Sequence, residues 1–227
     1  MAQSFAASRG RIDSRSQFIT MTYLHLFGAI MAFVALEVFF FQTGLAHRMA
    51  QAMLGGSWLL VLGGFMVSSW MATRFANSAK SLGAQYFGLA LFIVAEAVIF
   101  VPLLFIANTY APGAIETAAG ITVLGFAGLT AVVFTTRKDF SFMGSVLRWM
   151  GMLALVAIVS GVVFGFHLGV FFNIAMVGFA GGAILYDTSN VLHHYPVNRH
   201  VAASLQLFAS VAMLMWYVLQ IVMSSRD

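Results

Sequence analysis

The stretch LGAQYFGLALFIVAEAVIFVPLLFIA, residues 82–107, decides the fold class of this chain, and Glu96 is its only charged residue. An α-helix rises about 1.5 Å per residue and the hydrocarbon layer of a bilayer is about 30 Å thick, so roughly 20 mainly apolar residues cross it. The stretch therefore predicts a transmembrane helix.

Outward from this stretch, the rest of the chain has the same character. Hydrophobic residues make up 61% of the sequence and charged residues only 8%, against roughly 25% charged residues in soluble domains. The sequence predicts an all-α polytopic membrane protein with the lipid bilayer as its solvent. One transmembrane domain, 18–222, lies between a polar N-terminal tail, 1–17, and a short C-terminal tail, 223–227. The seven predicted spans are 18–42, 54–73, 82–107, 113–136, 146–166, 168–192 and 200–222.

The basic residues indicate orientation, because cytoplasmic segments are enriched in Lys and Arg. With a cytoplasmic N-terminus, only Arg48 and Arg226 fall outside. The inside set is Arg9, Arg11, Arg15, Arg74, Lys80, Arg137, Lys138, Arg148 and Arg199. These residues lie at span ends or in loops, so they indicate how the chain is oriented in the membrane. We therefore predict no nucleic-acid partner from the net charge of +4. A version with six spans, which moves the C-terminus inside, stays open on charge alone.

Three acidic residues, Glu37, Glu96 and Asp187, lie within predicted spans. An ionisable group near the bilayer centre costs on the order of 2.5–3.5 kcal/mol on insertion scales, so it normally faces the bundle interior, water or a partner. Each is a candidate for an ion pathway or for pH sensing. The alternative for each glutamate is a protonated carboxyl that makes a hydrogen bond between helices, and for Asp187 it is a cap or a water-exposed acid at a frayed helix end.

The last span carries a partly polar stripe that is expected to face inward. Its members, at helical spacings of three and four, are Gln206, Ser210, Met213, Tyr217 and Gln220. The stripe either lines a narrow path or holds the bundle together. Glycines four residues apart, at 161, 165 and 169 and at 178 and 182, predict close helix packing.

Catalysis and resident metals are not predicted. The chain has no Cys and no HEXXH motif, and no nucleophile, base and orienting group come together in the sequence. We therefore predict no enzyme, no catalytic residue, no metal site and no cofactor, with weak transient Ca²⁺ binding as the one exception.

Two stretches together resemble the Bax inhibitor-1 family, also called the transmembrane Bax inhibitor motif family. They are TTRKDFSFMG, residues 135–144, and ILYDTSNVLHH, residues 184–194. The resemblance is to a bacterial-type member. It implies a multi-pass protein of the bacterial inner (plasma) membrane, and a seven-helix bundle in which the other six helices surround the last one.

The same resemblance implies a role in pH-sensitive calcium leak or, in bacteria, in modulating the FtsH membrane protease. In leak-type members an aspartate at the position of Asp187 pairs with a second aspartate on the last span, where this chain has Phe208. The shared-proton pair is therefore missing here. Arg74, Gln206 and Ser210 are the candidate replacement partners of Asp187.

Two functional hypotheses follow. The first is a calcium, proton or other ion leak, or an ion-homeostasis role, with Asp187 as the gate and Ca²⁺ or H⁺ as the cargo. The second is a regulator that transports nothing and binds a membrane protease such as FtsH, or another membrane complex, through tail 1–17. A transporter of a small solute is a third, weaker alternative, because no internal repeat supports it.

Overall fold

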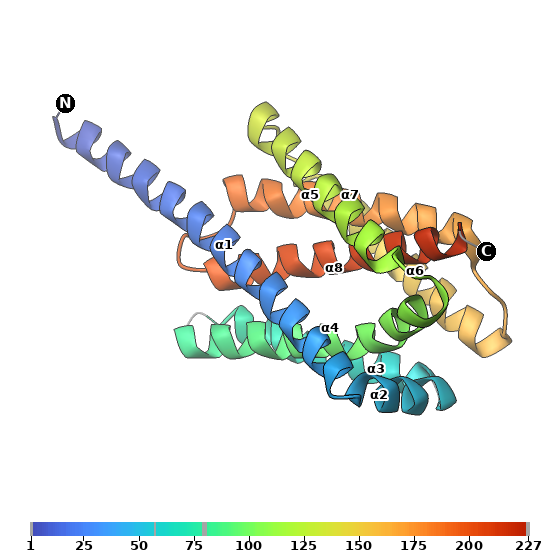
Figure 1. The fold of residues 1–227 in the computed structure, drawn as a ribbon. Helices are drawn as coiled ribbons and strands as arrows, with labels where there is room; N and C mark the ends of the chain where they lie inside the picture. The colour runs from blue at the N-terminus through green and yellow to red at the C-terminus, as the bar shows by residue number, and fades with distance from the viewer. Residues whose placement is uncertain (1, 57, 79–80, 226–227) are drawn as a thin grey trace.

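The computed structural model describes the backbone of residues 2–56, 58–78 and 81–225, with side chains from residue 13 onward. Lys80, Arg226 and the side chains of Arg9 and Arg11 lie outside the described residues. The described chain is a helical bundle (Figure 1). Its elements are α1 (Ala2–Gln42), α2 (Leu45–Gly55), α3 (Trp58–Ala76), α4 (Leu82–Tyr110), α5 (Ala114–Thr136), α6 (Met143–Phe164), α7 (Gly169–His193) and α8 (His200–Ser224).

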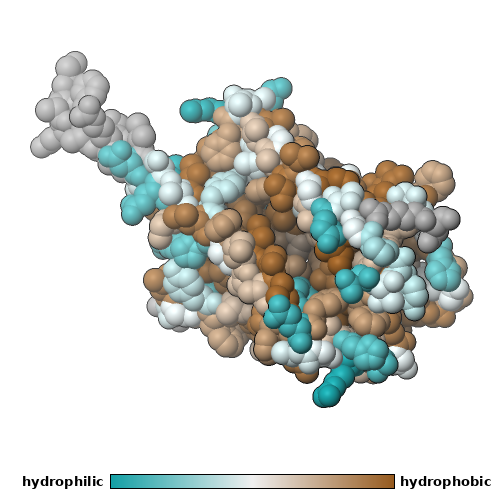
Figure 2. Space-filling view, viewed as in Figure 1, coloured by the Kyte–Doolittle hydropathy of each residue, from teal (hydrophilic) through white to brown (hydrophobic). Residues whose placement is uncertain are grey.

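Seven of these helices are long and apolar enough to cross a membrane, and α2 is the exception. The seven-span prediction is therefore confirmed over the described residues, and the six-span alternative is not supported. Helix α2 lies within a segment that the sequence assigned to a loop and to the start of a span, and it packs on α4. Apolar side chains cover much of the face in Figure 2, as expected for a surface in contact with lipid.

Helix α8 is the central helix of the bundle. It contacts α1, α3, α4, α5 and α7, which are five of the other six spans. The family resemblance implied contact with all six, and α6 is the one that differs. Helix α6 packs only against α7 and α3, so it stands apart from the centre of the bundle.

Helices α3 and α4 approach each other very closely at Gly88. A Cβ added to Gly88 would lie 2.4 Å from the backbone nitrogen of Ala76 and 2.5 Å from the carbonyl oxygen of Ala72. Ala72 and Ala76 are completely buried there. Small residues on both helices thus allow backbone contact, as in other membrane bundles.

The glycine pairs predicted from the sequence behave differently. Gly165 lies in the turn after α6 with a φ of 71°, and Gly169 is the first residue of α7 with a φ of 74°, so the prediction of helix packing at these two was wrong. Left-handed backbone favours glycine because it has no Cβ. Gly182 does pack closely, since an added Cβ would lie 3.1 Å from the side chain of Met143 on α6.

Candidate functional site at the end of helix α7

The last turns of α7 and the residues after it, 186–195, contact several other elements of the bundle. Successive residues of an α-helix point about 100° apart, so neighbours in this segment face different helices. Tyr186 faces α6, where a Cβ on Gly144 would lie 2.9 Å from its ring. Asp187 faces α8 and Thr188 faces α1 and α5. We call residues 186–195 the α7 end segment.

Asp187 is buried and joins α7 to α8. Its side chain is 3% exposed, and Ser210 Oγ donates a hydrogen bond of 2.5 Å to its Oδ2. Of the three candidate partners named from the sequence, Ser210 therefore makes the contact. Gln206 is exposed, and the exposed Arg74 has its guanidinium over the Trp70 ring, 4.7 Å from the ring centre.

Next to Asp187, Thr188 adds a second set of polar groups. The hydroxyl of Tyr23 on α1 approaches those of Thr130 on α5 and Thr188 on α7. All three hydroxyls are buried, and in the described part of the chain none has a partner at hydrogen-bonding geometry. Burying such a group costs about 1–3 kcal/mol. The polar region thus extends from α8 across α7 to α1 and α5.

The loop between α5 and α6, residues 137–142, starts from an unusual backbone conformation. Helix α5 ends at Arg137, which has a φ of 52° and is the one non-glycine residue with positive φ in the described chain. Its amide donates to the carbonyl of Val133 over 2.8 Å, which closes the last turn of α5. This turn directs the following residues toward α7.

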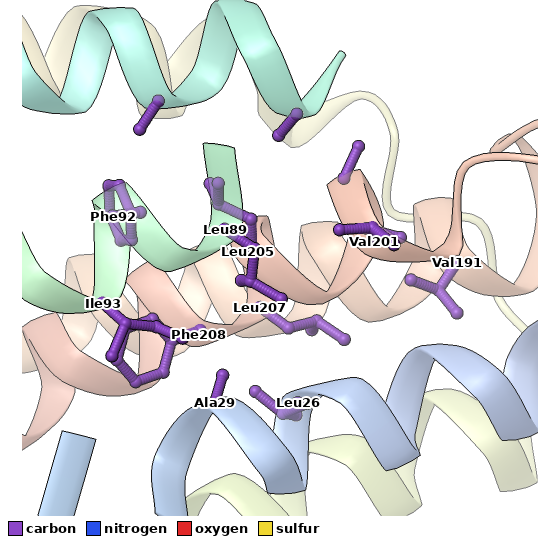
Figure 3. Close-up of a cluster of buried hydrophobic side chains, with 14 of the residues drawn as sticks. Leu26, Ala29, Leu89, Phe92, Ile93, Val191, Val201, Leu205, Leu207 and Phe208 are labelled. Atoms are coloured by element: carbon purple, nitrogen blue, oxygen red, sulfur yellow. The ribbon is translucent and has the colours of Figure 1, made fainter. Parts of the chain in front are cut away.

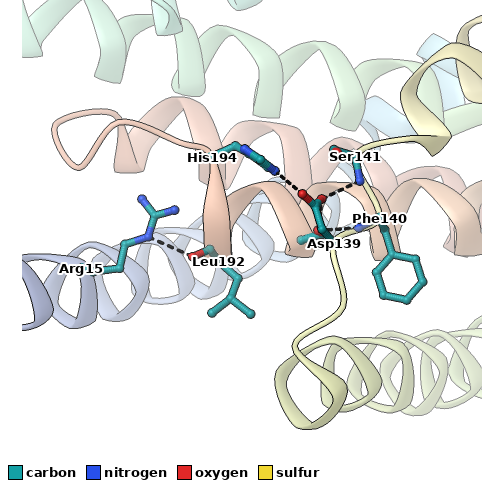
Figure 4. A network of polar contacts seen from close by, with 7 residues as sticks. Arg15, Asp139, Phe140, Ser141, Leu192 and His194 are labelled. Carbon is teal, nitrogen blue, oxygen red and sulfur yellow. Dashed lines mark hydrogen bonds and ion pairs between the residues drawn. The ribbon is translucent and has the colours of Figure 1, made fainter.

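Asp139 then fastens this loop to the α7 end segment (Figure 4). One carboxylate oxygen accepts from the Ser141 amide at 2.8 Å and from Ser189 Oγ at 3.3 Å. The other lies 2.8 Å from Nε2 of His194. The Phe140 amide donates to Ser189 Oγ at 2.9 Å. Loop 137–142 is therefore held to α7 by side-chain and backbone groups together.

The attachment of loop 137–142 depends on pH through the ionisation of the Asp139 carboxyl. The Ser141 amide, followed by the hydrogen bond and charge of His194, holds the pKa of Asp139 well below its usual range. A carboxyl whose pKa is lower in the folded protein than in the unfolded chain, where it is about 3.9, stabilises the folded state at pH values above 3.9. This stabilisation is lost as the pH falls toward the pKa of the folded protein. We expect the Asp139 contribution to weaken below about pH 4.

The measurement is hydrogen–deuterium exchange of loop 137–142, corrected for the intrinsic pH dependence of exchange. The loop should be protected at pH 5 and lose protection in more acidic buffer. Asp139→Ala should lower the protection at pH 5, while the bond from the Phe140 amide to Ser189 remains. Equal protection in wild type and variant would show that Asp139 does not hold the loop.

Arg15 fastens α1 to the same segment (Figure 4). Its Nε donates to the carbonyl of Leu192 over 3.0 Å, and a second guanidinium nitrogen donates to the carbonyl of Tyr195. These carbonyls lie at the carboxyl end of α7, where helical hydrogen bonds run out and the helix dipole is negative. A cation at this place satisfies and neutralises the helix end.

Two other acids named from the sequence lie elsewhere. Glu96 and Tyr217 line a separate cavity of about 1120 Å³. Glu37, on α1, is 7% exposed, and neither of its carboxyl oxygens has a hydrogen-bond partner in the described chain. The predicted site residues therefore divide into Asp187 with Ser210, Glu96 with Tyr217, and two that lie apart, Glu37 and Gln206.

Phe208 belongs to the apolar core (Figure 3). It is 2% exposed and its ring meets those of Phe33 and Phe92, with centroids 6.0 Å and 6.1 Å apart. The position at which the resemblance implied a second acid in leak-type members is thus packed with aromatic rings from α1, α4 and α8. Asp187 has a hydroxyl as its partner on α8.

Loop 137–142 and the α7 end segment both lie within a match to a known protein family. Residues 15–227 match the family described as "Inhibitor of apoptosis-promoting Bax1". The chain belongs to the Bax inhibitor-1 family. This match includes both motifs, TTRKDFSFMG and ILYDTSNVLHH, which form the two sides of the Asp139 contact. The resemblance seen in the sequence is therefore confirmed.

Among named members of the Bax inhibitor-1 family, "Modulator of FtsH protease YccA" of Escherichia coli K12 is 32% identical over 130 residues, 54% of this chain and 58% of that protein. "Bax inhibitor 1" of Schizosaccharomyces pombe is 30% identical over 170 residues, 72% of this chain and 61% of that protein. The matched part thus spans little more than half the length of these relatives. No solved structure matches the chain.

Several residues of this Bax inhibitor-1 site were not singled out from the sequence. Arg15 was assigned to topology, and His194 appeared only within the quoted motif 184–194. Asp139 and Ser189 appeared only as letters within the family motifs. For Asp139, Ser189 and His194 the one signal in the sequence was their place in the two family motifs, and no such signal marked Arg15.

Proposed function

We propose that this Bax inhibitor-1 family member is a membrane-embedded regulator that presents the N-terminal part of α1 to a membrane protease of the FtsH class. Helix α1 runs over 41 residues, or about 60 Å at 1.5 Å per residue, twice the thickness of the hydrocarbon layer. In Figure 1 its N-terminal turns project beyond the other helices. That projecting part is available to a partner.

The observation that carries the proposal is the attachment of α1 to the α7 end segment by Arg15. Because the attachment point follows directly after the projecting turns, it fixes the direction in which they leave the bundle. Asp139 holds loop 137–142 against the same segment. The position of the loop relative to the projecting turns of α1 is therefore fixed. The similarity to a relative named as a modulator of FtsH protease supports a protease as the partner.

Deletion of residues 2–12 tests the proposal, because it removes projecting turns and leaves Arg15 in place. The shortened protein should remain folded, as judged by gel filtration and thermal unfolding, and should no longer co-purify with the protease. Arg74→Gln is the matched control, since Arg74 is exposed and its guanidinium lies over the nearby Trp70 ring. Undiminished co-purification after the deletion would contradict the proposal.

A second candidate function is a low-flux leak of protons or calcium that Asp187 gates. The buried contact between Asp187 and Ser210 favours it, because an acid within a span commonly marks an ion or proton path. Calcium takes 6–8 oxygen ligands, and few are available beside Asp187, so protons suit the site better. In reconstituted vesicles from pH 5 to 8, a leak gives pH-dependent flux that Asp187→Asn alters, whereas a pure regulator gives the flux of empty vesicles.

A further inference from the structure

The large cavity lies where α6 stands away from the rest of the bundle. Helix α6 touches α3 and α7 but neither α4 nor α8, and the space between them is a cavity of about 1120 Å³. Small-molecule sites in proteins usually occupy about 300–1,000 Å³ and are mainly apolar with a few polar groups. This cavity is slightly larger than that range and has the mainly apolar lining of such a site.

Glu96 is the acidic group of this cavity. It lies in the middle of α4, 14 residues from Leu82 at one end and from Tyr110 at the other, so about 20 Å of helix separates it from either end. Its side chain is 7% exposed and lines the cavity, and the described chain offers it no hydrogen bond. Ser69 on α3 also lines the cavity, and its buried hydroxyl has no partner there.

Aromatic rings surround the same space. Trp58, Phe100, Trp216 and Tyr217 all line it, and the rings of Phe100 and Trp216 meet edge to face with centroids 5.0 Å apart. Aromatic faces attract ammonium groups, and an acid buried without a partner gains most from a cation. A carboxyl group surrounded by aromatic rings is therefore suited to bind the ammonium group of an amine.

We propose that this cavity binds a single-chain hydrophobic amine, with the ammonium group at Glu96 and the chain along the apolar walls. The two-chain lipids of the bilayer fit this place less well. Their charged headgroups lie at the membrane surface, whereas Glu96 lies about 20 Å from either end of α4. This site is separate from the α7 end segment and does not depend on the proposed protease partner.

Two cavity tryptophans allow a direct test. The chain has four tryptophans, and Trp70 and Trp149 are exposed on the surface of the bundle. In a Trp70→Phe, Trp149→Phe protein, the fluorescence of Trp58 and Trp216 reports on the cavity. The probe is dodecylamine carrying bromine on its chain, because bromine quenches tryptophan on contact. The matched probes are the brominated alcohol and carboxylic acid of equal chain length, all in phosphatidylcholine nanodiscs.

The amine should quench the two tryptophans saturably and at lower concentration than the alcohol or the acid. Glu96→Gln should weaken amine binding at least about tenfold, or roughly 1.4 kcal/mol. Glu37→Gln should leave it unchanged, since Glu37 is equally buried but does not line the cavity. Ala209→Phe, which fills part of the cavity and leaves Glu96 in the sequence, should also weaken quenching.

Either of two results would overturn the proposal. One is equal, non-saturating quenching by all three probes, which is simple partition into lipid. The other is amine binding by Glu96→Gln as tight as in the parent protein. If Glu96→Gln does not fold, Ala209→Phe decides, because full amine binding by that variant means that the cavity is not the site.

Discussion

Gly88→Ala is expected to leave little folded protein. The added Cβ would lie 2.4 Å and 2.5 Å from backbone atoms of α3, well inside van der Waals contact. Backbone cannot rotate aside as a flexible side chain does, so α3 and α4 would have to separate. Overpacking commonly costs about 1–3 kcal/mol and occasionally more. Because the clash is with backbone atoms of another helix, we expect a loss of about 3 kcal/mol or more.

The measurements for Gly88→Ala are the yield of monodisperse protein and its thermal unfolding temperature. Gly28→Ala is the matched control, because Gly28 lies in α1 and nothing within 4 Å would meet its Cβ. Alanine is the better helix former by about 1 kcal/mol, so this control should be neutral or slightly stabilising. Equal unfolding temperatures for Gly88→Ala and wild type would show that α3 and α4 do not approach as described.

Ser210→Ala is expected to have the second largest effect. The change removes the hydroxyl that donates to Asp187 and leaves a carboxyl that is 3% exposed without that partner. Loss of one partner of a buried polar pair costs about 1–3 kcal/mol, and more when the remaining group is charged. The contact between α7 and α8 should therefore weaken, and the unfolding temperature should fall.

Ser204→Ala is the control for Ser210→Ala. Ser204 is completely buried on the same helix, but its hydroxyl donates to the carbonyl of Val201, three residues earlier. Its removal leaves no buried acid unpaired, so it should cost less. Thermal unfolding of both variants in the same nanodiscs gives the comparison. A larger loss for Ser204→Ala would mean that the Asp187 contact contributes little to stability.

The seven spans were predictable because lipid leaves few choices. Backbone groups in a bilayer must be satisfied within the segment, so a long apolar stretch such as 82–107 forms a helix whatever its neighbours are. Helix α2 was not predicted, because a helix that does not cross the membrane needs no long apolar stretch. It has 11 residues, too few to cross, and hydropathy alone does not separate such a helix from the adjoining loop.

Which groups meet across the bundle was harder to predict. Arg15 and Leu192 are 177 positions apart in sequence, and no periodic pattern indicates that they touch. Asp187 could be recognised because an acid inside a span is rare. Asp139 lies in a loop, where an acid is common, so only its backbone and side-chain partners distinguish it. The close approach at Gly88 likewise depends on Ala72 and Ala76 of another helix.

We propose that Arg15 holds α1 on the α7 end segment so that the N-terminal turns of α1 regulate a protease. The most direct measurement is the rate at which an FtsH-class protease degrades a membrane substrate in vesicles that also contain this chain. Wild type and Arg74→Gln should change that rate equally, and Arg15→Gln should lose most of the effect while remaining folded. A rate that is the same with Arg15→Gln as with wild type, or the same with and without this chain, would contradict the account.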